Sequence, residues 1–138
     1  MIVLDTNVVS EVLRPQPHPE VDRWAHAVPA AELCVSAITV AELWTGAAVM
    51  PHGRRRDDIV ERTAVFLDGL GGPVLPFDAR AAAYFAQIQA LQRARGQVPG
   101  VLDTQVAAIC LTHDARLATR NVRDFKGLGV SLVNPWTA

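Results

Sequence analysis

The chain has 138 residues, of which 50% are hydrophobic and 20% charged, with a mean hydropathy of +0.17 and a formal net charge of −1. This length predicts one domain, and the composition excludes a disordered chain. No stretch without Asp, Glu, Lys or Arg exceeds 12 residues, which excludes a transmembrane helix of ~20 apolar residues. The near-neutral net charge confines any nucleic-acid binding to a local site.

The cysteines and the first residues bear on the compartment. The sequence begins Met-Ile-Val-Leu-Asp, without the basic segment of a signal peptide, which favours the cytoplasm. Cys34 and Cys110 have apolar neighbours, and their spacing fits neither a zinc pair nor a redox pair. We therefore expect two buried, reduced thiols, as in a reducing compartment.

Short apolar runs alternate with stretches of helical periodicity along the whole chain. Asp5 or Thr6 can cap a helix directly after the first apolar run, and Asp78 can cap an alanine-rich helix. The expected strands are residues 2–4, 33–36, 74–77, 116–119 and 130–133. The expected helices are residues 6–13, 19–28, 38–50, 54–70, 79–95 and 102–112. This alternation predicts an α/β fold, with a mainly parallel twisted sheet flanked by helices, as a single domain over residues 1–138.

Three acidic residues lie in mainly apolar surroundings near the expected carboxyl ends of strands. Asp5 directly follows the first strand, and Glu42 lies in the second helical turn after strand 33–36. Asp103 shares a helical face with Val106 and Cys110, so that it interrupts an apolar stripe. Ligands of open parallel sheets bind beyond the carboxyl ends of the strands, and we expect the three acids to meet there.

Clustered, buried carboxylates are costly unless they are paired or bound to a cation. No lysine is close in sequence, and Arg120 is the single nearby cation. Hard oxygen ligands with few histidines predict Mg²⁺ or Mn²⁺. Each acid alone also has a structural explanation: Asp5 can cap a helix, Glu42 can lie at an exposed helix position, and Asp103 can stabilise a helix start. The three acids together indicate a metal site more specifically than any one of them does.

Two further polar residues follow strand 116–119. Asn121 lies two residues past the strand end, and Asp124 lies one helical turn further on. Asp124 can reach the same edge or cap a short turn over residues 125–128. We expect Asn121 as a direct neighbour of the metal and Asp124 as a more distant or water-mediated partner. The cations Arg123 and Lys126 lie beside this edge, where they can contact phosphate.

Five segments together resemble the PIN-domain ribonucleases of the VapC toxin family, in particular its FitB-like branch. Each motif is short, but the set covers essentially the whole chain in the family's order and spacing. The matching segments are Leu4-Asp5-Thr6-Asn7, residues 36–43 (SAITVAEL), residues 102–108 (LDTQVAA), residues 118–125 (ATRNVRDF) and Asn134-Pro135-Trp136.

The resemblance implies a metal-dependent endoribonuclease that uses Mg²⁺ or Mn²⁺ and leaves 5′-phosphate and 3′-hydroxyl ends. Asp5, Glu42 and Asp103 fall on the family's three main acidic positions, where they hold the metal. The fourth acidic position falls on Asn121, with Asp124 three residues on, so the catalytic set is expected among these five residues.

The resemblance also implies a homodimer, held inactive by an antitoxin protein in a type II toxin–antitoxin system, with DNA contacted through the antitoxin alone. Two other functions remain open. Phosphoryl-transfer enzymes with an aspartate nucleophile also have an Asp after the first strand, but they need a second Asp where this chain has Asn7. The alternative is a catalytically weak or inert PIN-fold partner in an antitoxin-led repressor complex on DNA.

Overall fold

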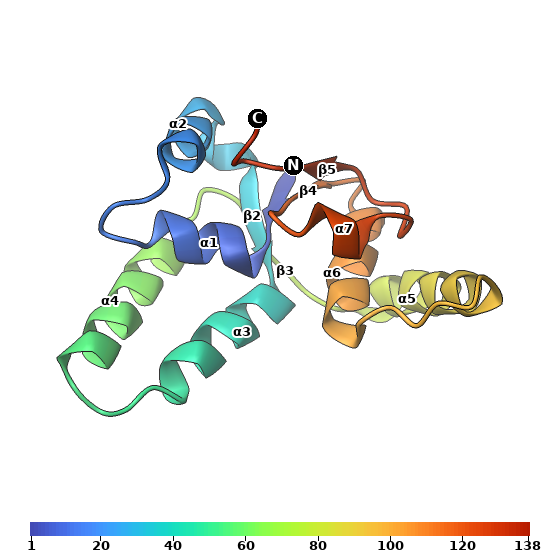
Figure 1. The fold of residues 1–138 in the computed structure, drawn as a ribbon, viewed down its shortest axis with the longest axis horizontal. Coiled ribbons are helices and arrows are strands. Elements are labelled where there is room, and N and C mark those ends of the chain that lie inside the picture. The colour runs from blue at the N-terminus through green and yellow to red at the C-terminus, as the bar shows by residue number, and fades with distance from the viewer.

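The computed structural model describes residues 1–138 and contains a five-stranded parallel sheet in the order β3-β2-β1-β4-β5 (Figure 1). The five strands are β1 (Ile2–Leu4), β2 (Leu33–Ser36), β3 (Val74–Leu75), β4 (Arg116–Ala118) and β5 (Leu132–Val133). The central strand is therefore the first one in the sequence, as in the doubly wound order 3-2-1-4-5-6. The predicted α/β architecture with a parallel sheet is confirmed.

Seven α-helices surround the sheet. They are α1 (Thr6–Val12), α2 (Pro19–Ala27), α3 (Ala37–Ala48), α4 (Arg54–Asp68), α5 (Ala79–Ala94), α6 (Val101–Thr112) and α7 (Val122–Phe125), with a 3-10 turn at Ala30–Glu32. In Figure 1, α1, α3 and α4 lie on one side of the strands, and α5 and α6 on the other. None of the helices combines the length and the apolar character that crossing a membrane requires.

Each face of the sheet has its own apolar core, because successive side chains of a strand point to opposite faces. Val3 points into the core under α5, α6 and α7, which also contains the fully buried Phe125. Ile2 and Leu4 point into the second core, formed with Val8 and Val9 of α1 and with residues of α3 and α4. The buried strand 2–4 thus holds both layers of helices in place.

Three strands are shorter than predicted, and β4 ends at Ala118, one residue before its predicted end. The strand β3 ends at Leu75, because its last partner is Ser36 and the chain of β2 turns into α3 after that residue. The strand β5 begins at Leu132, because β4 offers it only Leu117 and Ala118 as partners. The chain also forms α7 over Val122–Phe125, where a turn over residues 125–128 was expected.

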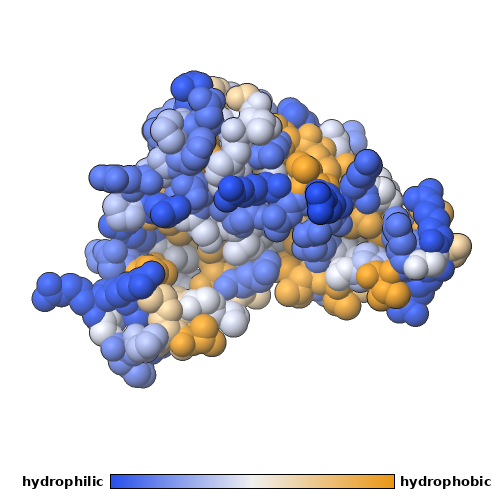
Figure 2. Space-filling model, viewed as in Figure 1, coloured by the Kyte–Doolittle hydropathy of each residue, from blue (hydrophilic) through white to orange (hydrophobic).

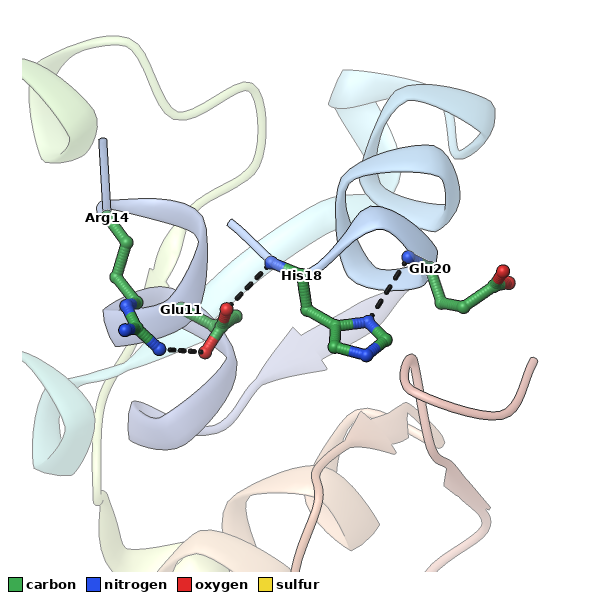
Figure 3. A network of polar contacts seen from close by, with 4 residues as sticks. All are labelled: Glu11, Arg14, His18 and Glu20. Carbon is green, nitrogen blue, oxygen red and sulfur yellow. Dashed lines mark hydrogen bonds and ion pairs between the residues drawn. The ribbon is translucent and has the colours of Figure 1, made fainter. Parts of the chain in front are cut away.

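A small polar network fixes the loop between α1 and α2 (Figure 3). The half-buried Glu11 carboxylate accepts a hydrogen bond of 2.7 Å from the backbone N–H of His18, and its other oxygen pairs with Arg14. His18 Nδ1 in turn accepts from the backbone N–H of Glu20, which caps α2. His18 is therefore a surface residue with a capping role in the fold.

Both cysteines are buried and free, as predicted. Cys34 lies in β2 and Cys110 in α6, within the core that contains Val3. Burial raises the pKa of the Cys34 thiol to about 11 and raises that of Cys110 as well. Both side chains therefore stay protonated at neutral pH and act as small apolar residues.

Candidate active site

The carboxyl ends of β1, β2 and β4 meet at one edge of the sheet. Leu4, the last residue of β1, is in register with Val35 of β2 and with Ala118 of β4. The residues that follow these strand ends therefore lie side by side, and Asp5 is tied to β4 by a backbone hydrogen bond to the carbonyl of Ala118. Parallel pairing thus brings distant segments of the chain to a common site.

Asp5 is held rigidly at this edge. It is 6% exposed, and its Oδ1 accepts from the backbone N–H of Thr6, which caps α1. Its Oδ2 accepts from the hydroxyl of Thr119 at 2.7 Å and from the amide of Asn7 at 3.0 Å. Three neutral donors and no cation thus satisfy a nearly buried carboxylate.

Glu42 reaches the same edge from α3. This helix begins directly after β2, where the Ser36 side chain caps it by accepting from the backbone N–H of Thr39. The Oε1 of Glu42 accepts a hydrogen bond of 2.8 Å from the Thr6 hydroxyl. Because the backbone N–H of Thr6 binds Asp5, this one threonine orients two of the three predicted acids.

Asp103 completes the cluster from the first turn of α6. Burial raises the pKa of its carboxyl, and the negative charges of Asp5, Asp124 and Glu42 raise it further, in that order. None of these four carboxylates forms an ion pair with Lys, Arg or His. The structure therefore brings together an acidic cluster whose charge no side chain compensates.

The donor set has the chemistry of a site for a hard divalent cation, since it offers carboxylate oxygens without His or Cys. The side chains do not, however, form a ready-made cage, because no three His, Cys, Asp or Glu side chains converge closely enough to hold an ion. Both oxygens of Asp5 are engaged in hydrogen bonds within the chain. Mutual repulsion of the carboxylates also favours this spread arrangement.

Asn121 and Asp124 lie at the two ends of one turn of α7. Asn121 precedes the helix, and its backbone N–H donates to the Thr119 hydroxyl, whereas its exposed side chain forms no hydrogen bond. Asp124 is exposed but near enough for its charge to act on Asp103. Both therefore lie at the predicted edge, and the choice between them as fourth ligand stays a prediction.

Sequence reasoning missed the residues that position the acids. Thr119, Asn7 and Thr6 form the hydrogen bonds described above, and each lies within three residues of a strand end. Asn7 also accepts from the backbone N–H of Arg120, whose guanidinium lies 5.2 Å from the centre of the Trp136 ring. The sequence signal that could have identified these positioning residues is a polar residue shortly after a buried strand.

The raised pKa of Asp103 makes stability depend on pH in a defined direction. Between the ordinary pKa of Asp and the raised pKa, the folded chain holds a proton that the unfolded chain has lost, so stability falls as pH rises. Asp103→Asn should therefore raise the melting temperature of the metal-free protein at neutral pH and flatten its fall as the pH rises above the ordinary pKa of Asp, about 3.9. Glu61→Gln, which removes an exposed and unpaired carboxylate of α4, is the matched control.

The same melting experiment tests for a cation. Mn²⁺ at about a hundredfold excess over its dissociation constant should stabilise the wild type by ~2.7 kcal/mol, and should stabilise Asp103→Asn much less. No shift of the wild type between chelator and millimolar Mn²⁺ would contradict the metal site.

The chain is similar to known proteins in sequence and in structure. The sequence matches the PIN domain model over residues 2–129. VapC ribonuclease Y4jK from Sinorhizobium fredii is 42% identical over 137 residues, which cover 99% of this chain and 98% of that protein. Toxin FitB from Neisseria gonorrhoeae is 39% identical and covers 99% of both chains. The structure of FitAB bound to an IR36 DNA fragment matches with a TM-score of 0.90 at 37% identity, over 99% of this chain and 96% of that one.

Proposed function

Because the chain belongs to the PIN domain family, we propose that it is the toxin of a type II toxin–antitoxin pair, an endoribonuclease that hydrolyses RNA phosphodiester bonds with Mg²⁺ or Mn²⁺. The observation that carries this proposal is the uncompensated cluster of Asp5, Glu42 and Asp103 at the carboxyl edge of the sheet. The full-length similarity to proteins named VapC ribonuclease and toxin FitB supports it.

The proposed roles follow from the contacts. Asp5, Glu42 and Asp103 would hold the cation, which supplies a water of lowered pKa and neutralises charge on the phosphoryl oxygens. Thr119 and Asn7 fix the orientation of the Asp5 carboxylate. Positioning of this kind matters because a displacement of about 1 Å at a reacting group can cost about a hundredfold in rate.

We propose an antitoxin protein as partner, and a homodimer as the state of this chain. The similar FitAB structure is a toxin–antitoxin complex on DNA. The net charge of −1 gives this chain little attraction for DNA of its own, so DNA contact falls to the antitoxin. A groove of about 590 Å³ between α1, α3 and α4 could receive a partner segment, and its lining includes Leu43 and Met50 as well as Thr6 and Glu42.

The alternative function, a catalytically inert partner in a repressor complex, draws on one observation. The acids do not form a ready-made metal cage. Glu42 nevertheless accepts a hydrogen bond from the hydroxyl of Thr6, whose backbone N–H donates to Asp5, and this shared anchor for two of the acids favours a working site.

Expression of the chain alone in bacteria distinguishes the two functions. We expect the wild type to arrest growth, and Asp5→Asn to restore it at an equal level of folded protein, because the substitution removes a ligand charge at constant volume. Glu61→Gln should remain toxic. Normal growth with abundant, folded wild-type protein would favour the inert partner.

A further inference from the structure

A second hollow, of about 610 Å³, lies beside the acidic cluster and takes no part in the contacts described so far. Its walls come from the end of α5, from the loop over residues 95–100 and from α7 with the loop that follows it. In Figure 1 this first loop returns from the far end of α5 to the start of α6. The polar and charged side chains that line the hollow include Gln92, Arg95, Arg123, Asp124 and Lys126.

The side chains that line the hollow carry more positive than negative charge, although the chain as a whole has a formal net charge of −1. Arg95, Arg123 and Lys126 are exposed and line it, against Asp124 as the one acid. None of the three cations forms an ion pair. Figure 2 shows strongly hydrophilic residues over α7 and over the far end of α5. Three unpaired cations around a concave surface leave their charge available to an anionic ligand.

The hollow borders the acidic cluster at Asp124. Asp124 lines it, and the charge of this residue acts on Asp103. On the other wall, Pro99 precedes Gly100, at which a Cβ atom would lie 3.7 Å from Oδ2 of Asp103. An extended ligand that left the hollow past Asp124 and Pro99 would therefore come close to Asp103.

The two walls are joined by a buried side chain. Gln92 is 2% exposed, and its Nε2 donates a hydrogen bond of 2.7 Å to the carbonyl of Gly127. The carbonyl of Gln92 accepts from the backbone N–H of Gln97 at 2.8 Å, which ties the loop back to α5. The spacing of the three cations is thus set by the fold and not by a free loop.

We propose that Arg95, Arg123 and Lys126 bind backbone phosphates of the RNA strand next to the bond that is cut, an inference that rests on the proposed ribonuclease function. Guanidinium and ammonium groups bind phosphate oxygens strongly. No aromatic side chain lines the hollow to provide a ring for base stacking, so we expect recognition there to depend on phosphate and not on base identity. Sequence preference must then arise elsewhere in the site.

The test compares two triple variants of equal charge. R95Q/R123Q/K126Q removes the three cations of the hollow, and R80Q/R93Q/R116Q removes three exposed cations that line no described hollow. Binding of a fluorescent single-stranded RNA 12-mer of mixed sequence is measured in chelator, so that no cleavage is needed. Each phosphate contact with single-stranded nucleic acid adds about 0.7 to the slope of log affinity against log salt.

The hollow variant should lose about 2 from this slope and on the order of 100-fold in affinity at about 0.1 M salt, whereas the control should lose only a few-fold. With Mn²⁺ present, KM should rise and kcat should change little. Equal RNA affinity of the two variants, or no RNA binding by the wild type, would overturn the proposal. If the proposed ribonuclease function itself were wrong, the wild-type protein would not cleave RNA, and this outcome is distinct from a failure of the phosphate-binding proposal. An unchanged Mn²⁺-dependent melting shift confirms that both variants keep the fold and the acidic cluster.

Discussion

Asp5→Asn and Asp103→Asn are each expected to abolish RNA cleavage while leaving the fold intact. Loss of a ligand charge should cost ~1000-fold or more in rate, about 4 kcal/mol of transition-state stabilisation. The Asp5→Asn side chain keeps an acceptor for the backbone N–H of Thr6, and the Thr119 hydroxyl can turn to accept from the new amide, so that only the hydrogen bond from the Asn7 amide is lost. Single-turnover cleavage of a mixed RNA pool measures the rates, and circular dichroism measures the fold.

The double variant Asp5→Asn with Asp103→Asn distinguishes a shared role from separate ones. If both carboxylates act by holding the same cation, the second substitution should cost little more than the first, because residues that act as a unit are not additive. Glu61→Gln should cleave at the wild-type rate. Rate losses that multiply in full would show that the two acids perform independent tasks.

Phe125→Ala is expected to be the most damaging single substitution in the core near the site. Phe125 is 1% exposed within the core under α5, α6 and α7. Truncation of a buried phenylalanine costs about 3–5 kcal/mol. The four-residue helix α7 is too short to be stable without such an anchor. We therefore expect α7 to detach locally, so that Asp124 leaves the neighbourhood of Asp103.

Val122→Ala is the matched control, since it lies on the same helix and is 39% exposed. It should change the free energy of unfolding by less than ~1 kcal/mol. Urea unfolding measures both variants, and the pH dependence of stability reports the lost effect of Asp124 on Asp103. A Phe125→Ala variant with wild-type stability would contradict the assigned anchor role.

Local patterns were enough to predict most of the elements and the place of three acids near one edge of the sheet. The run Ile-Val-Leu before Asp5 can only be buried, and parallel strands place their carboxyl ends together, so the position of Asp5 followed from the sequence. Asp103 was visible because it interrupts an apolar helical stripe. Such signals lie within one turn or one strand of the residue concerned.

Contacts between distant segments were beyond such patterns. The Thr119 hydroxyl binds Asp5 across 114 positions of the chain, and Gln92 binds the carbonyl of Gly127 across 35. These two hydrogen bonds depend on the strand order of the sheet and on the packing of the helices, which local periodicity does not encode. For the same reason Arg95, which lies on an exposed helix end, could not be assigned to the neighbourhood of Arg123.

Cleavage of a mixed RNA pool by the purified, partner-free chain tests the central claim most directly. With millimolar Mg²⁺ or Mn²⁺ the wild type should produce fragments that carry 5′-phosphate and 3′-hydroxyl ends, and chelator should stop the reaction. Asp5→Asn and Asp103→Asn protein purified in parallel should leave the RNA intact, which excludes a contaminating nuclease. Intact RNA after incubation with folded, Mn²⁺-loaded wild type, or equal cleavage in chelator, would contradict the account.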